Sequence, residues 1–193
     1  MSSQTRNILL ILVAIAIVAA IIVLQNPFQQ SSSASAGQGN KYGLITAPGS
    51  SQSMSPPFMG HPAPNFVLPD MNGNPVRLDS FRGKIVLINF WATWCPYCVR
   101  EMSDMGQAAN IFKDDLVILA VNTGESKSKV KRFVDANGIS YPILLDTESV
   151  VAQAYLVAGM PTSYYVDKEG IIRQIVVGYH NLSEMERIIK SIS

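Results

Sequence analysis

The sequence contains two cysteines, and both lie in the stretch Trp94-Cys95-Pro96-Tyr97-Cys98. An apolar run ends near Phe90, and the residues from Pro96 to about Phe112 have the pattern of a helix that opens with proline. At a helix start, unsatisfied N–H groups and the macrodipole favour negative charge, which lowers the pKa of the Cys95 thiol. Cys98 follows about one turn later and can attack a mixed disulfide formed at Cys95. The pattern predicts thiol–disulfide exchange, with Cys95 as nucleophile and Cys98 as resolving thiol.

A C-x-x-C pair has two other uses, in zinc sites and in structural disulfides. A zinc site needs more ligands, and only His61 and His180, near opposite ends of the domain, are available to complete one. A purely structural disulfide would close a loop too short to add much stability. We therefore favour redox chemistry, expect no metal, and interpret both histidines as ordinary surface or internally satisfied residues.

The cysteines must be positioned by the elements around them, and after His61 strand and helix patterns alternate. Asn72-Gly73, between two short apolar segments, is typical of a β-hairpin. The whole pattern predicts a three-layer α/β sandwich with a mixed central sheet, preceded by that hairpin. Expected strands are 65–68, 76–78, 84–90, 116–121, 143–145, 163–166 and 171–177, and expected helices are 96–112, 127–136, 148–155 and one starting at Ser183 with a capping box to Glu186.

The N-terminal part has a different composition. Charged residues make up only 15% of the chain, and Ile8–Leu24 is an unbroken apolar run. A helix of that length spans roughly 25 Å, which is the short end of what a bilayer core requires. We interpret residues 8–24 as an uncleaved transmembrane anchor. The alternatives are a signal peptide cleaved near Ala34–Ala36, which lies far from the run, and a buried helix, which should show a polar stripe.

The remaining boundaries follow from charge and composition. Arg6 precedes the apolar run, so the positive-inside rule places residues 1–7 in the cytoplasm and the rest of the chain outside. Residues 25–60 are rich in Ser, Gln, Gly and Pro, which predicts a flexible tether or, less simply, a weakly folded arm. Residues 61–193 form the expected domain. The net charge of +1 argues against a nucleic-acid-binding protein.

Several further motifs carry a resemblance to a known family. The cysteine motif, the preceding Ile88–Thr93 (INFWAT) and Gly159–Thr162 (GMPT) resemble the thioredoxin superfamily. Ala63–Leu68 and Val121–Ser126 are similar to proteins of the ResA/TlpA type. That resemblance implies a thioredoxin-like domain held outside the cytoplasm by a membrane anchor, acting as a thiol–disulfide oxidoreductase with no cofactor beyond its cysteine pair.

The resemblance also implies roles for other side chains. Pro161 matches the cis-proline position at which backbone pairs with substrate, and Trp94 and Met160 would border the same substrate surface; otherwise Pro161 is an ordinary proline at a strand start. Glu101 matches an acidic residue that moves protons and tunes the thiols, the alternative being a solvated helix glutamate. Thioredoxin has an aspartate where this sequence has Asn89, so that proton route is expected to be absent.

The function implied is that of a reductant. It would take electrons from a membrane thiol–disulfide transporter and reduce disulfides in client proteins such as apocytochrome c. The dipeptide Pro96-Tyr97 is the glutaredoxin pair, so an oxidase or a general envelope reductase remains open. A peroxidase is a weaker alternative because Ala92 stands where peroxiredoxins place Thr. A copper chaperone would use a C-x-x-x-C pair with a downstream histidine such as His180.

Overall fold

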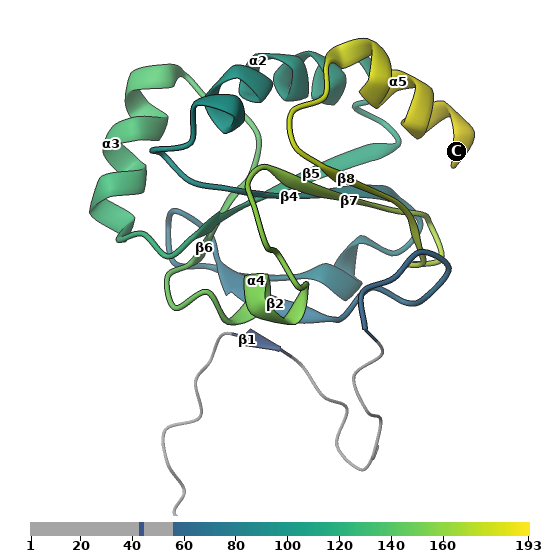
Figure 1. The fold of residues 1–193 in the computed structure, drawn as a ribbon, viewed down its shortest axis with the longest axis horizontal. Coiled ribbons are helices and arrows are strands. Elements are labelled where there is room, and N and C mark those ends of the chain that lie inside the picture. The colour runs from purple at the N-terminus through teal and green to yellow at the C-terminus, as the bar shows by residue number, and fades with distance from the viewer. Residues whose placement is uncertain (1–42, 45–55) are drawn as a thin grey trace, which may run out of the picture. The chain divides into compact units, whose positions relative to one another are not determined.

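The computed structural model describes residues 43–44 and 56–193, which lie in a compact unit spanning Asn40–Ser193. Within this part of the chain, five strands form a central sheet in the order β6-β5-β4-β7-β8, and three shorter strands form a second sheet (Figure 1). The elements are β1 (Gly43–Leu44), β2 (Phe66–Pro69), β3 (Pro75–Arg77), the 3-10 helix η1 (Leu78–Phe81), β4 (Ile85–Trp91), α2 (Pro96–Ile111), β5 (Leu116–Thr123), α3 (Lys127–Asn137), β6 (Ile143–Asp146), α4 (Val150–Ala154), β7 (Thr162–Val166), β8 (Ile172–Val177) and α5 (Leu182–Ser191).

The central sheet is mixed, as the sequence predicts. Strands β4, β5 and β6 run parallel, whereas β7 pairs antiparallel with both β4 and β8. Every residue of β4 is buried, because this central strand has covering layers on both of its faces. The chain leaves the carboxyl end of β4 and enters α2 through Trp94 and Cys95, so the cysteine motif lies at the carboxyl edge of the parallel strands.

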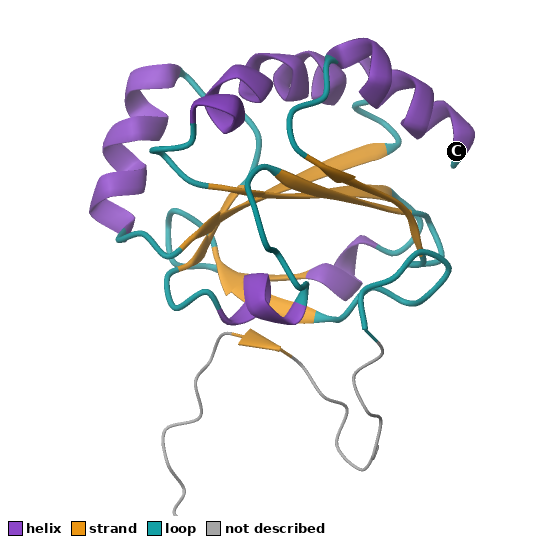
Figure 2. Ribbon diagram, viewed as in Figure 1, coloured by secondary structure: helices purple, strands orange, loops and turns teal. Residues whose placement is uncertain are grey.

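Alternation along β4 divides the core in two. Ile85, Leu87 and Trp91 face the side covered by α2, α3 and α5, and the cluster on that side includes both cysteines. Val86, Ile88 and Phe90 face the side covered by α4, η1 and the β2–β3 hairpin (Figure 2). Because the side-chain period of a strand is two, Asn89 faces the same layer as Trp91 and points a polar group toward α2.

The second sheet is built around β2. It pairs antiparallel with β3, and the Asp70 carboxylate accepts hydrogen bonds from the backbone N–H groups of Asn72 and Asn74 in the connecting turn. On its other side β2 pairs with β1. Gly43–Leu44 lie within the segment 25–60 expected to be a tether, and the N–H of Gly60 donates to the carbonyl of Ile172, so parts of that segment hydrogen-bond to the domain.

Two local predictions were wrong. The last helix begins at Leu182 and its capping box joins Asn181 to Glu184, two residues before the predicted pair. The Asn181 side chain accepts the N–H of Glu184 at 3.1 Å, and Glu186 instead pairs with Lys190. Leu78, expected to end a strand, begins η1 and is buried.

The predicted cytoplasmic segment 1–7, the anchor 8–24 and most of the tether 25–60 lie outside the described residues. Within residues 43–44 and 56–193, no helix is both long enough and apolar enough to cross a bilayer.

Candidate active site

Cys95 is the N-cap residue of α2, and Cys98 lies in the first turn of the same helix. The two sulfurs form a disulfide, with the Cα atoms 5.3 Å apart. The backbone N–H of Cys98 donates to Cys95 Sγ at 3.2 Å, which is the contact of an N-cap side chain with a free donor of the first turn. When the disulfide opens, the same donor and the helix dipole stabilise a thiolate on Cys95.

The sulfurs are recessed while their neighbours are exposed. Cys95 and Cys98 are 3% and 2% exposed, whereas Trp94 and Tyr97 are 67% and 61% exposed. Large exposed aromatic side chains are typical of surfaces that bind other proteins. The site therefore offers an apolar surface around a disulfide that solvent barely reaches.

Glu101 lies one helical turn after Cys98 and is fully buried, which excludes the alternative of a solvated helix glutamate. Residues three apart on a helix share a face, which places the carboxylate on the Cys98 side of α2. Asn89 donates to Glu101 Oε2 at 3.0 Å and to Ser163 Oγ at 2.9 Å. Asn89, which stands where thioredoxin has an aspartate, therefore hydrogen-bonds to a carboxylate that α2 supplies.

A histidine lies against the other oxygen of Glu101. His180 is 3% exposed, and its Nδ1 is 2.5 Å from Glu101 Oε1, although the contact lacks the direction of a conventional hydrogen bond. The backbone N–H of His180 also donates to Oε1, at 3.4 Å. On the far side of the ring, Nε2 is 2.6 Å from the hydroxyl of Tyr165. Burial, assisted by the charge of Glu101, raises the pKa of Tyr165, which keeps the phenol protonated.

A second buried carboxylate holds the loop in front of the cysteines. Glu125 accepts hydrogen bonds from the N–H and hydroxyl of Thr93, each at 2.7 Å, and from Asn122 at 2.8 Å. Lys129 forms an ion pair with it at 2.7 Å. Burial tends to raise the pKa of Glu125, but the bonds from Lys129, Thr93 and Asn122 outweigh it and lower the pKa below the ordinary value. Thr93 is two residues before Cys95, so Glu125 fixes the approach to the nucleophile.

The Met160–Pro161 peptide bond is cis, as the resemblance implies. Thr162 pairs with Phe90 in the sheet, so Pro161 lies just beyond the end of β4, where the chain turns toward Cys95. Pro161 is buried and Met160 is half-buried against the core that contains the cysteines. The two residues are therefore at the same edge of the sheet as the disulfide.

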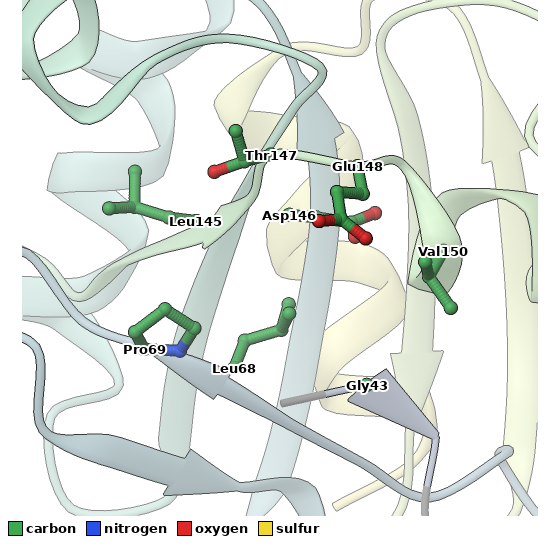
Figure 3. A pocket seen from close by; sticks show the side chains of 8 residues that line it. All are labelled: Gly43, Leu68, Pro69, Leu145, Asp146, Thr147, Glu148 and Val150. Atoms are coloured by element: carbon green, nitrogen blue, oxygen red, sulfur yellow. The ribbon is translucent and has the colours of Figure 1, made fainter. Parts of the chain in front are cut away.

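A small cavity of about 160 Å³ lies at the carboxyl end of β6 and is lined by Asp146, Glu148 and mostly apolar neighbours (Figure 3). The Asp146 carboxylate accepts from the backbone N–H groups of Val151 and Ala152, at 3.2 and 2.8 Å, and so caps α4. Burial raises the pKa of Asp146 despite these bonds. Among the described residues, no group of three or more His, Cys, Asp or Glu side chains could hold a metal ion.

The structure thus brings together Cys95, Cys98 and Glu101, and places Trp94, Met160 and Pro161 around them at the sheet edge. Sequence reasoning missed the roles of Glu125 and His180. For Glu125 the signal was an acidic residue just before a helix, in the motif Val121–Ser126. No local pattern predicts that its side chain contacts Thr93. For His180 there was no signal beyond its residue type.

Comparisons with known proteins agree with this geometry. The profile of the AhpC/TSA family matches residues 59–175. The thiol–disulfide oxidoreductase ResA of Geobacillus kaustophilus is 43% identical over 135 residues, covering 69% of this chain and 78% of the relative. ResA of Bacillus subtilis is 42% identical over 120 residues, covering 62% and 67%. A crystal structure of a thiol:disulfide interchange protein of the thioredoxin family from Chlorobium tepidum superposes with a TM-score of 0.62 at 30% identity, covering 68% of this chain and 94% of that one.

Proposed function

The chain belongs to the AhpC/TSA family and is a thioredoxin-like thiol–disulfide oxidoreductase, and from that premise we propose that it works as a reductant tethered to the outer side of a membrane. Its electrons come from a membrane thiol–disulfide transporter. Its clients are proteins with accessible disulfides, among which apocytochrome c is the one we favour.

The observation that supports the reducing direction is the complete burial of Glu101 one turn from Cys98. A buried negative charge destabilises a nearby thiolate, so it disfavours the dithiol form relative to the disulfide. A protein whose reduced form is less stable is a stronger reductant, the reverse of the strong oxidants whose reduced form is stabilised. The hydrogen bonds from Asn89 and from the backbone N–H of His180 offset part of this charge, and the N-terminus of α2 favours the thiolate on Cys95. The balance between these effects sets the reduction potential.

The exchange proceeds in two steps. The Cys95 thiolate attacks one sulfur of a client disulfide, forming a mixed disulfide and releasing the first client thiolate. Cys98 then gives its proton to Glu101 and attacks Cys95, which re-forms the internal disulfide and releases the second client thiolate. Glu125 and Thr93 hold the loop, and Pro161 offers its backbone edge to an extended client segment.

Membrane tethering rests on the apolar run Ile8–Leu24, and it suits a protein that exchanges electrons with a membrane transporter. Apocytochrome c fits as client because its C-x-x-C-H cysteines must be thiols before haem attaches. Such a segment is unfolded until then, so it can lie along the exposed surface of Trp94 and Tyr97.

The first experiment equilibrates the full-length chain, in detergent micelles, with glutathione and dithiothreitol redox buffers and measures the Cys95–Cys98 potential. A reductant should give roughly −270 mV or lower, near thioredoxin, whereas a value near roughly −120 mV would reverse the direction. A synthetic peptide carrying a C-x-x-C-H disulfide then tests the client. Deletion of the gene should lower covalently bound c-type haem, and unchanged haem in a strain without a second such protein would rule apocytochrome c out.

An oxidase or a general envelope reductase of the same fold is the first alternative, and peroxidase activity is a weaker one, because the segment that starts the hairpin also resembles peroxiredoxin-like chains. Ala92 is fully buried at the position where peroxiredoxins carry a threonine that faces peroxide, so the site lacks that hydroxyl. We expect turnover of hydrogen peroxide by the reduced chain to be slow. Rapid peroxide consumption that requires Cys95 would support the peroxidase instead.

A further inference from the structure

Glu101 is fully buried, and the exchange proposed above, on which this inference rests, requires it to take up the proton of Cys98 and lose it again. The exposed side of the site lies over the cysteines, next to Trp94 and Tyr97. A bound client protein covers that surface at the moment Cys98 releases its proton. A carboxylate in this position therefore needs a second connection to solvent.

His180 is placed to provide that connection. Its Nδ1 lies 2.5 Å from Glu101 Oε1, and its Nε2 lies 2.6 Å from the Tyr165 hydroxyl. The residue also lines a cavity of about 190 Å³ between β8 and α5, together with Glu184, Arg173 and Arg187. A polar cavity of that size has room for several water molecules. It lies on the α5 side of Glu101, and neither cysteine lines it.

We propose that His180 is a positioning residue of the redox site, which holds Glu101 Oε1 and relays its proton to the cavity beside α5 while a client covers the cysteines. The proposal uses thiol–disulfide exchange at Cys95 and Cys98 and does not depend on the reducing direction or on the client. Its failure would therefore leave the function proposed above untouched.

The proton balance shows what is relayed. The reduced protein, with a Cys95 thiolate and a Cys98 thiol, transfers two electrons to one client disulfide. The products are the Cys95–Cys98 disulfide, two client thiolates and one proton from Cys98. That proton passes to Glu101 and from Oε1 to His180 Nδ1, while the ring gives up the proton carried on Nε2 toward the water of the cavity. The client thiolates take up two protons from the surrounding water after release. One S–S bond is broken in the client and one is formed here.

The ionisable groups around His180 are consistent with such a relay. Tyr165 of β7 stays protonated because burial raises its pKa, so it binds Nε2 without competing for the proton. The imidazole ring has two nitrogens, with Nδ1 toward Glu101 and Nε2 toward Tyr165, so it can accept a proton at one and release a proton from the other. The groups that face the Glu101–His180 pair are Tyr141 before β6, Tyr165 on β7, Arg173 on β8, and Glu184 and Arg187 on α5.

The test compares His180→Gln with the wild type in the full-length chain, in detergent micelles. Single-turnover oxidation of the dithiol form is followed by tryptophan fluorescence from about pH 5 to 9, the range in which histidine titrates. Two disulfides serve as probes: oxidised glutathione, which is small and leaves the site open to water, and insulin, which covers it. We expect the variant to be slower by about tenfold with insulin but less than about twofold with glutathione, and its rate to lose the histidine ionisation. His61→Gln, the same change at an exposed histidine, should behave as the wild type.

Equal slowing with both probes and an unchanged pH profile would show that His180 only supports packing, and would overturn the proposal. If His180→Gln fails to fold, a measurement on the wild type decides. Nitrogen NMR of labelled histidine reports the protonation of the His180 ring in the disulfide and dithiol forms. A change in its titration between the two forms supports the relay, and identical titration in both contradicts it.

Discussion

Asn89 of β4 donates a 3.0 Å hydrogen bond to Glu101 of α2, so the strand and the helix on either side of the cysteine motif are joined behind it. Both side chains are buried, and an unpartnered buried carboxylate would be costly. The bond therefore sets the position of the charge that acts on Cys98. It also means that a change at Glu101 alters electrostatics without opening the core, provided that the new side chain can still accept from Asn89.

Glu101→Gln meets that condition. Loss of the buried charge should stabilise the Cys98 thiolate and raise the reduction potential by tens of millivolts, since about 30 mV corresponds to about 1.4 kcal/mol. Redox-buffer titration of the full-length variant measures the shift. Glu148→Gln, at an exposed glutamate, is the control. A potential equal to that of the wild type would show that Glu101 does not tune the thiols.

Glu125→Gln should weaken the loop before Cys95. Because the folded-state pKa of Glu125 is lowered, its contribution to stability is present above the ordinary carboxyl value and lost as pH falls through the folded-state pKa. We expect a loss of about 1–3 kcal/mol at neutral pH, typical of a buried charged hydrogen-bonding group, which shrinks below about pH 4. Thermal unfolding against pH measures it. Lys129→Ala removes only the half-exposed partner and should cost less; an equal cost would place the effect in the ion pair rather than in the bonds to Thr93.

Cys98→Ser should trap clients as mixed disulfides on Cys95, because the resolving thiol is gone while the N-cap thiolate remains. The adducts are detected as mass shifts on non-reducing gels and identified by mass spectrometry. Cys95→Ser leaves only Cys98, which lacks the N-cap position, and should trap little. Equal trapping by both variants would contradict the assignment of the nucleophile.

Trp94→Ala should affect clients more than stability. The side chain is 67% exposed, so the melting temperature should remain within about 2 °C of the wild type. The KM for insulin should rise severalfold while the rate with oxidised glutathione is unchanged, because only a protein client covers the indole. Arg132→Ala, on the exposed face of α3, serves as the control. An unchanged KM would remove Trp94 from the client surface.

The stability contribution of Asp146 should depend on pH in the opposite direction to that of Glu125, and Asp146→Asn tests this. Burial raises the folded-state pKa of Asp146, so the wild type loses stability as pH rises from the ordinary value through the folded-state pKa. Asparagine keeps one acceptor for the N–H groups that start α4 and carries no charge. The stability of the variant relative to the wild type should therefore rise, by up to about 1 kcal/mol, between about pH 4 and 7. A difference that does not vary with pH would show that Asp146 acts only as a cap.

The parts of the site that lie close in sequence could be predicted from it. The position of Cys95 at a helix start, the resolving role of Cys98 and the shared face of Cys98 and Glu101 all follow from helix geometry. The mixed sheet follows from the order of apolar runs. The exact start of α5 could not be predicted, because Asn181 and Ser183 are both good N-cap residues and only packing of the helix decides between them.

The contacts that complete the site join residues far apart in the chain. Glu101 is buried because His180 and Asn89 pack against it from two other elements, and the helical pattern around Glu101 contains no trace of either. The same holds for Glu125 and Thr93. Spacing predicts which side chains share an element. The neighbours that set the charge and position of those side chains depend on how β4, the loop after β5 and the loop between β8 and α5 pack around the start of α2.

The depth of the two sulfurs affects how fast the cysteine pair exchanges electrons with small molecules and with proteins. The two cysteines are almost closed to solvent and lie next to exposed aromatic side chains. At such a depth we expect the pair to react slowly with small solutes, with free thiols in the disulfide form and with oxidants in the dithiol form. Electrons placed on the pair should therefore persist until a flexible polypeptide segment reaches into the recess. Slow exchange of this kind keeps the cysteine pair out of equilibrium with the surrounding redox buffer. The rate of electron transfer is then set by binding of a partner protein and not by the redox potential of the compartment.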